Sequence, residues 1–396
     1  MNRGSPLEVL RVFLRLGLTS FGGPIAHLGI FRAELIARRA WMTEAAFAEL
    51  LGLCQFLPGP TSSQLGFALG ISRAGWLGGL AAWTGFTLPS AALMLAFASG
   101  ASVLGGRSGA GLIHGLKLVA VAIVAQAVWS LGKTLCPDKE RATLACVAAL
   151  LALAGPPSIG QLAAIACGAA AGLLVCRSAE THSSESIHLP ISPRAGLVCL
   201  SIFLFLLLVP PLLAPRLQLP ALTLFNAFYR PGALVFGGGH VVLPLLRDAM
   251  VDTGLVSNEA CLAGYGAAQM VPGPLFSFAA FLGAVASPMP GVGGGCIALL
   301  SIFLPGGLIL AGTVPFWNLL RENGRARASV RGANAAVVGL LAAALFDPLW
   351  TTTIHGRGDF AAALTLFILL TAWRLPPLAV ALLGAAGGLL APLLGR

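Results

Sequence analysis

The chain has 396 residues, of which 57% are hydrophobic and only 10% are Asp, Glu, Lys or Arg, whereas about 25% are charged in an average soluble domain. This composition excludes a soluble enzyme, a nucleic-acid-binding domain, a disulfide scaffold and a disordered chain. The formal net charge of +10 comes from basic residues spread among short loops, which is typical of membrane orientation and not of polyanion binding. We therefore expect an all-α polytopic membrane protein. Its expected partner is the lipid bilayer, and we do not expect it to bind nucleic acid.

Long apolar segments follow one another from the first residues onward. Because a spanning helix needs about 20 apolar residues, they predict roughly 10 to 13 transmembrane helices. No cleavable signal peptide is expected, since Arg11 and Arg15 interrupt the first segment. In chain order the segments are 9–31, 61–80, 81–104, 112–131, two helices within 143–176, 195–213, 222–245, 274–292, 293–315, 333–349, 360–373 and 376–394.

A polar, serine-rich stretch at 177–194 divides the chain into segments 1–176 and 195–396. We interpret it as a solvated linker, although His182 and His188 within it leave a metal role open as an alternative. The eight cysteines show no CxxC spacing, so they are expected to be small apolar helix residues. Neither a metal nor a cofactor is therefore expected.

The two halves repeat the same order of motifs, which predicts a duplication. Phe, Gly-Gly, Arg and Glu recur at an offset of 215, Gln and Pro-Gly-Pro recur at 214, and Leu88-Pro89 recurs as Leu304-Pro305 at 216. The first copy contains Phe21-Gly22-Gly23, Arg32, Glu44, Gln55 and Pro58-Gly59-Pro60, and the second contains Phe236-Gly237-Gly238, Arg247, Glu259, Gln269 and Pro272-Gly273-Pro274.

The charges of the loops predict that the two copies have opposite orientations. The loop after the first F-G-G has three arginines and one glutamate, net +2, and its counterpart has one arginine and two aspartates, net −1. The next pair reverses this: 101–111 has only Arg107, whereas 317–332 has four arginines and one glutamate, net +3. Because basic loops stay in the cytoplasm, this pattern indicates an inverted repeat.

The helices that end at Pro-Gly-Pro are too short to cross a membrane. Segment 44–57 has 14 residues, or about 21 Å of helix against a core of about 30 Å, and 259–271 is shorter still. We expect helices broken inside the membrane, where a break must line a cavity or be buried in protein. The alternative is a structural kink. After the first break, Thr61, Ser62, Ser63 and Gln64 offer hydroxyls and N–H groups to an anion or as caps, and Ser277 follows the second.

Several ionisable residues are candidates for substrate, proton or gating roles. His27 and His240 follow the F-G-G motifs and either contact an anion, carry a proton or pack as hydrogen-bonded helix residues. The matched pairs Arg32/Arg247 and Glu44/Glu259 are either gating charges or interfacial anchors. Thr43 and Asn258 directly precede the two glutamates, which favours a capping role for these glutamates at their helices. Glu49 and Lys117 lie in apolar segments, where charge is costly. No catalytic motif is present, so we do not expect an enzyme.

The segment Phe21–Gly70 resembles the chromate ion transporter family. The resemblance lies in F-G-G-P-x-A-H, in R-R-x-W at Arg38–Trp41, and in E-L-L-x-L-C-Q-x-L-P-G-P-T-S-S-Q; the second copy, with FGGGHVVLPLLRD and QMVPGP, is similar to the C-terminal domain of the family's long form. This resemblance implies chromate export across the bacterial inner membrane, chromate resistance and two domains of opposite orientation. The substrate region it implies comprises Gly22, Gly23, Pro24, His27, Gln55, Pro58, Gly59, Pro60, Thr61, Ser62, Ser63 and Gln64, together with Gly237, Gly238, Gly239, His240, Gln269, Pro272, Gly273, Pro274 and Ser277.

Other functions remain open at this point. Chromate and sulfate are both tetrahedral dianions, so a general sulfate-like oxyanion carrier is the first alternative and an anion channel is the second. A membrane enzyme or assembly partner is less favoured, and a homodimer is left open. Export needs no ATPase, because an inside-negative potential drives a dianion outward by roughly 4.6 kcal/mol per 100 mV.

Overall fold

The computed structural model describes residues 4–21, 23–101, 107–154, 157–176, 189–235, 241–317, 319 and 323–390. All regular elements in these ranges are helices, which confirms the expected all-α class. The first half contains α1 (Pro6–Thr19), α2 (Gly23–Phe31), the π-helix η1 (Arg32–Arg38), α3 (Glu44–Phe56), α4 (Thr61–Ala101), α5 (Arg107–Leu135), α6 (Lys139–Ala154) and α7 (Pro157–Val175). The second contains α8 (Pro193–Leu217), α9 (Pro220–Leu234), α10 (Val242–Met250), α11 (Asn258–Ala268), η3 (Leu275–Ser277), α12 (Phe278–Val285), α13 (Val292–Thr313), η4 (Val314–Phe316), α15 (Gly324–Ala344), η5 (Leu345–Trp350), α16 (Arg357–Thr371) and α17 (Pro377–Leu390).

Five helical stretches among the described residues are long and apolar enough to cross a membrane: Thr61–Gly100, Gly111–Leu135, Pro193–Leu217, Val292–Phe316 and Gly324–Asp347. Shorter apolar helices accompany them, as expected of a polytopic membrane protein with broken helices. Segments 9–31 and 222–245, each expected as one span, fold as the pairs α1/α2 and α9/α10. Gly23 has a φ of +76°, a conformation that suits glycine and interrupts the first segment.

Each Pro-Gly-Pro leads into a helical hairpin. In the first half, α4 is interrupted at Gly75, whose φ of +64° and ψ of −160° are not helical. The two arms pack so closely that a Cβ at Gly70 would meet the carbonyl oxygen of Gly78. In the second half α12 and α13 form the corresponding hairpin, with Gly283 against Gly294. Small residues at these contacts allow the backbones to approach, as is common between membrane helices.

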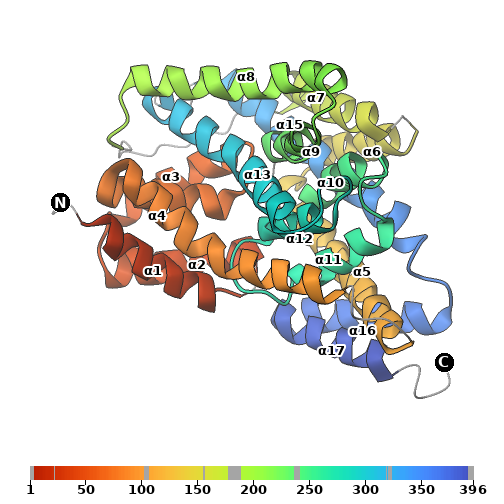
Figure 1. Cartoon of the computed structure of the whole chain (residues 1–396). Coiled ribbons are helices and arrows are strands. Elements are labelled where there is room, and N and C mark those ends of the chain that lie inside the picture. Colours follow the sequence, from red (N-terminus) through yellow and green to blue (C-terminus); the bar gives the residue numbers. More distant parts are fainter. Residues whose placement is uncertain are drawn as a thin grey trace.

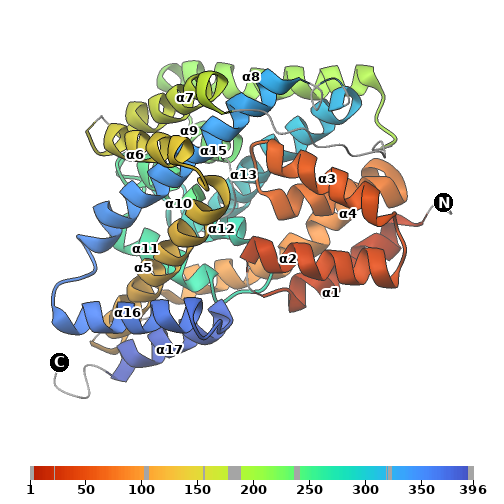
Figure 2. The same cartoon turned by 180° about the vertical axis from the view of Figure 1, so that it is seen from behind.

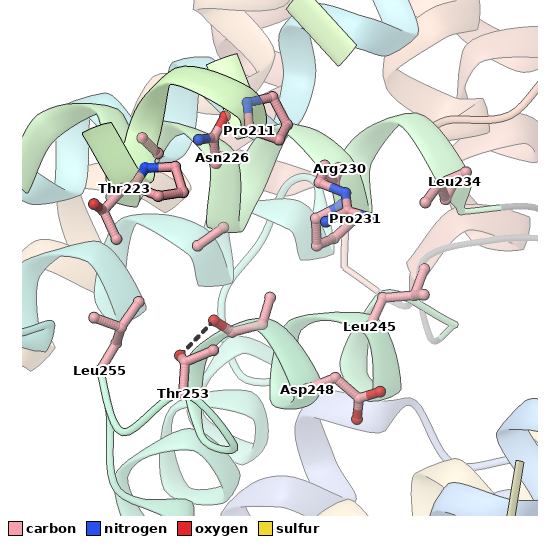
Figure 3. A pocket seen from close by; sticks show the side chains of 14 residues that line it. Pro211, Thr223, Asn226, Arg230, Pro231, Leu234, Leu245, Asp248, Thr253 and Leu255 are labelled. Carbon is pink, nitrogen blue, oxygen red and sulfur yellow. Dashed lines mark hydrogen bonds between the residues drawn. The ribbon is translucent and has the colours of Figure 1, made fainter. Parts of the chain in front are cut away.

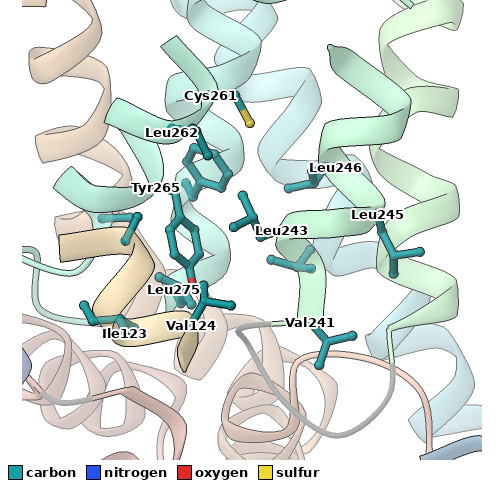
Figure 4. Packing of buried hydrophobic residues seen from close by; sticks show 14 of the residues in the cluster. Ile123, Val124, Val241, Leu243, Leu245, Leu246, Cys261, Leu262, Tyr265 and Leu275 are labelled. Carbon is teal, nitrogen blue, oxygen red and sulfur yellow. The ribbon is translucent and has the colours of Figure 1, made fainter. Parts of the chain in front are cut away.

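The two halves exchange their terminal helix pairs. In both views α6 and α7 of the first half lie against α15 of the second, whereas α16 and α17 of the second half lie against α5 of the first (Figures 1 and 2). The helices α4 and α13 cross the middle of the molecule between these groups (Figure 1). The largest apolar core also joins both halves: Tyr265 and Leu262 of α11 lie near Leu243 of α10 and Val124 of α5 (Figure 4). Neither half therefore buries its apolar surface alone.

Candidate functional site

Each Pro-Gly-Pro break donates one backbone hydrogen bond to the other repeat, so the two breaks form a reciprocal pair of bonds. The Gly59 N–H donates to the carbonyl oxygen of Val235 at 2.7 Å, and the Gly273 N–H donates to that of Ser20 at 2.8 Å. Ser20 and Val235 directly precede the two F-G-G motifs and are related by the offset of 215. The same contact is thus made twice with the roles exchanged, which is the signature of a two-fold relation.

The sequence Pro-Gly-Pro explains why these glycines make the bonds. Proline has no N–H, so the central glycine is the only backbone donor of each motif. Gly59 and Gly273 have φ values of +125° and +96°, which other residues adopt only with strain. A Cβ at Gly59 would lie 2.7 Å from Gln64 Nε2 and 3.0 Å from the Cα of Gly306; one at Gly273 would lie 3.0 Å from Ser90 Oγ. The breaks are therefore closely packed parts of the site.

His27 joins the start of α4 to this contact. Its Nε2 lies 3.2 Å from the carbonyl oxygen of Ser20, and its Nδ1 lies 3.5 Å from Ser62 Oγ. Because a carbonyl oxygen only accepts, Nε2 carries the proton, and in the neutral ring the Ser62 hydroxyl donates to Nδ1. The ring is buried and packs edge-on against Phe86 at 5.2 Å. The Ser20 carbonyl oxygen thus accepts hydrogen bonds from both His27 and Gly273. Residues of the first and the second repeat therefore meet at this oxygen.

Unpaired polar atoms adjoin the first break. Ser63 Oγ and Gln64 Oε1 are buried and have no hydrogen-bond partner within the described ranges. The amide nitrogen of Gln64 is satisfied, since it donates to the carbonyl oxygens of Pro58 at 2.8 Å and Gly306 at 3.1 Å. Ser63 and Gln64 line a cavity of about 430 Å³ together with Trp83, whose indole N–H likewise has no partner in the described part of the chain. The Ser63 hydroxyl and the Trp83 indole are thus two donors available to an anion.

The remaining residues predicted for the substrate region differ in their burial and in their distance from the cavity. Pro60 lines the same cavity and Thr61 is half-buried at the start of α4, but Gln55 is exposed on α3. Its counterpart Gln269 is buried on the C-terminal side of α11, and Ser277 is buried in η3. Outside the described residues lie Gly22, the side chain of Pro24, and Gly237, Gly238, Gly239 and His240.

The matched charges do not form matched ion pairs. Arg32 contacts Glu44 at 2.9 Å with both side chains more than half exposed, where an ion pair contributes little. Glu259 is instead 3.9 Å from the largely buried Lys117, and Arg247 lies 3.6 Å from Asp252.

Helix capping differs between the two copies as well. The Thr43 hydroxyl caps α3, as the capping interpretation requires, but Ser257, and not Asn258, is the N-cap of α11. The hydroxyl one residue earlier satisfies the first free N–H groups, so Asn258 enters the helix.

The sequence motifs do not predict one contact and one pair of cavity residues. The indole of Trp317 donates to Glu49 Oε1 at 2.6 Å, which satisfies a buried carboxylate of α3 from the second half of the chain. Arg15 and Arg230 line separate cavities on α1 and α9. They match at the offset of 215, so extending the repeat upstream of F-G-G would have revealed them.

Asp248 of α10 is a carboxyl with a perturbed pKa outside the five long apolar helices. Burial, reinforced by the charge of Asp252, raises its pKa to about 7, although the positive charge of Arg247 opposes this. Its buried Oδ2 has no hydrogen-bond partner among the residues that the structure describes, and it lines the same cavity as Arg230 (Figure 3). This carboxyl therefore changes charge near neutral pH.

The comparisons with known proteins agree with the repeats. A family model described as Chromate transporter matches residues 7–173 and 222–389. A chromate transport protein of Pseudomonas aeruginosa is 30% identical over 95% of this chain and 89% of its own length; one of Cupriavidus metallidurans is 25% identical over 85% and 81%. An uncharacterized transporter of Methanocaldococcus jannaschii is 25% identical over 86% and 84%. No solved structure matches.

Proposed function

The chain belongs to the chromate transporter family, and from this premise we propose that it exports chromate from the cytoplasm as a secondary transporter and so confers chromate resistance. The observation that carries the proposal is the reciprocal binding of the two breaks, Gly59 to Val235 and Gly273 to Ser20. It gathers the motifs of both repeats around one place, where a single tetrahedral dianion can contact both halves.

The groups at the first break suit such an ion. The cavity beside it has the Ser63 hydroxyl and the Trp83 indole N–H as donors with no partner among the described residues. The first turn of α4 adds backbone N–H groups with partial positive charge. Its other walls are largely apolar, so few competing waters surround the ion and each hydrogen bond is stronger than in bulk water. Ser62 is held by His27, which orients the turn.

The direction of transport follows from orientation and membrane potential. With the basic loop after the first F-G-G in the cytoplasm, the two repeats have opposite orientations in a bacterial inner membrane. A transporter with inverted halves exposes its site alternately to the two sides. The inside-negative potential then favours outward movement of a dianion. The proposed units are the repeat at 1–176, the linker at 177–194 and the repeat at 195–396; α8 lies between the two family matches.

The test is chromate uptake into inverted membrane vesicles, in which cellular export appears as uptake. We expect uptake that depends on the membrane potential and persists in excess sulfate. Uptake abolished by modest sulfate would instead identify a general oxyanion carrier, and a large non-saturable current would identify a channel. Absence of uptake by well-inserted protein would refute the proposal.

Serine substitutions locate the site. Ser62→Ala combined with Ser63→Ala should abolish most uptake while the protein still inserts. Of the single variants, Ser63→Ala should raise KM more, because the Ser62 hydroxyl is engaged by His27. Ser99→Ala is the matched control, since Ser99 lies exposed near the other end of α4. Normal uptake by the double variant would exclude the first break as the binding site.

A further inference from the structure

Two cavities outside the Pro-Gly-Pro site occupy the same place in the two repeats. The first, of about 290 Å³, lies beside α1 and includes Arg11, Arg15 and Arg39. The second, of about 420 Å³, lies among α8, α9 and α10 and includes Asn226 and Arg230 (Figure 3). Arg15 and Arg230 match at the repeat offset of 215, as do Arg11 and Asn226. The duplication therefore produced a pair of related cavities, each with an arginine at the same position.

Each cavity adjoins the core contact through its own helix. Ser20 follows Arg15 by five positions and Val235 follows Arg230 by five, which is about 7.5 Å along a helix. Ser20 and Val235 are the carbonyl groups that bind the two breaks. Leu234, the residue before Val235, itself lines the second cavity. An anion held at either arginine is thus close to one side of the proposed site.

The cavities differ in their available charge. In the first, Arg39 is paired with Glu34 at 2.8 Å and Glu8 with Arg73 at 3.0 Å. Arg11 and Arg15 are exposed and have no carboxylate partner in the described part of the chain.

In the second cavity, Asn226 replaces Arg11, and Asp248 adds a carboxyl group whose Oδ2 has no hydrogen-bond partner within the described ranges. Asp248 faces Arg247 and Asp252 on its own segment, and Arg230 of α9 lines the same cavity. Among the described residues, the first cavity thus presents two arginines without a carboxylate partner to a dianion, whereas the second presents one arginine offset by an acidic group.

We infer that these cavities are the two access sites of the transporter: Arg15 with Arg11 captures the oxyanion on the side from which it is exported, and Arg230 holds it on the opposite side, where Asp248 favours its release. The inference rests on the proposed function. The first cavity binds the dianion more tightly because charge-assisted hydrogen bonds from two arginines act together. The weaker second cavity lets the ion leave instead of trapping it.

The experiment measures KM for chromate and for sulfate in vesicles of both orientations. In inverted vesicles, which present the cytoplasmic face, Arg15→Gln should raise KM roughly tenfold and Arg230→Gln should leave it near the wild-type value. In right-side-out vesicles with an imposed inside-positive potential the pattern should reverse. Arg216→Gln, an exposed arginine of α8 that lines neither cavity, is the control for loss of one surface charge.

The outcomes separate this inference from the proposed function. If wild-type protein transports an oxyanion but Arg15→Gln behaves like Arg216→Gln in inverted vesicles, the access sites are refuted and the transport function stands. An equal rise of KM in both orientations for either variant also refutes them, because it indicates a structural role. If the wild-type protein moves neither ion, the proposed function fails and this inference fails with it.

Discussion

Replacing Gly59 with alanine tests whether the breaks hold the two repeats together. Its φ of +125° is unfavourable for any side chain, at a cost of about 1–2 kcal/mol. The new Cβ would also lie 2.7 Å from Gln64 Nε2, and displacing that amide from the Pro58 carbonyl costs about 1 kcal/mol more. We therefore expect Gly59→Ala to lower the free energy of unfolding by about 2–3 kcal/mol and to impair chromate uptake.

Substitutions at two other glycines separate the backbone cost from the steric cost of the new Cβ. Gly254 has a φ of +74° but nothing within 4 Å of its Cβ position, so Gly254→Ala should show only the backbone cost of about 1–2 kcal/mol. Gly52 lies in α3 with open space around it, and Gly52→Ala should stabilise the protein by about 0.5–1 kcal/mol. The assays are thermal unfolding of purified protein and uptake by vesicles. A Gly59→Ala protein as stable and active as Gly52→Ala would refute the reasoning.

Three further substitutions probe charge and contacts between the halves. The pKa of Asp248 is raised to about 7, so the stability that this carboxyl contributes is complete below its ordinary pKa of 3.8 and is lost as pH rises through 7. Asp248→Asn should therefore flatten the decline in Tm between pH 5.5 and 8. An unchanged slope of Tm against pH would contradict this. Burial tends to raise the pKa of Glu34, but hydrogen bonds from Arg39 and Arg38 outweigh it and lower the pKa. Stability from Glu34 is therefore present above its ordinary pKa of 4.5 and is lost as pH falls through the lowered pKa, so Glu34→Gln should lower Tm less at acid pH than at pH 7. Trp317→Phe removes the donor to the buried Glu49 and should cost about 1.5–3 kcal/mol; chemical unfolding with equal midpoints for variant and wild type would exclude this role.

The repeat and the breaks are visible in the sequence because they depend on local chemistry. A long apolar segment must form a helix in lipid whatever its neighbours, and Pro-Gly-Pro interrupts a helix wherever it occurs. The all-α class, the broken helices and the correspondence of Gly59 with Gly273 follow from such rules. The sequence also contains the match of Arg15 with Arg230, once the repeat is extended beyond its most obvious motifs.

Which of these residues meet was decided by the tertiary structure. Residue spacing does not specify that each break binds the backbone of the other repeat, that Glu259 pairs with Lys117 when Glu44 pairs with Arg32, or that Gln55 is exposed when Gln269 is buried. These outcomes depend on the rotation of each helix about its axis and on packing between segments that lie far apart in the sequence. The sequence determines the helices and breaks of this transporter and their two-fold correspondence. Close packing between the halves selects which residues contact one another, because the partners of a side chain are set by neighbours that the local sequence does not contain.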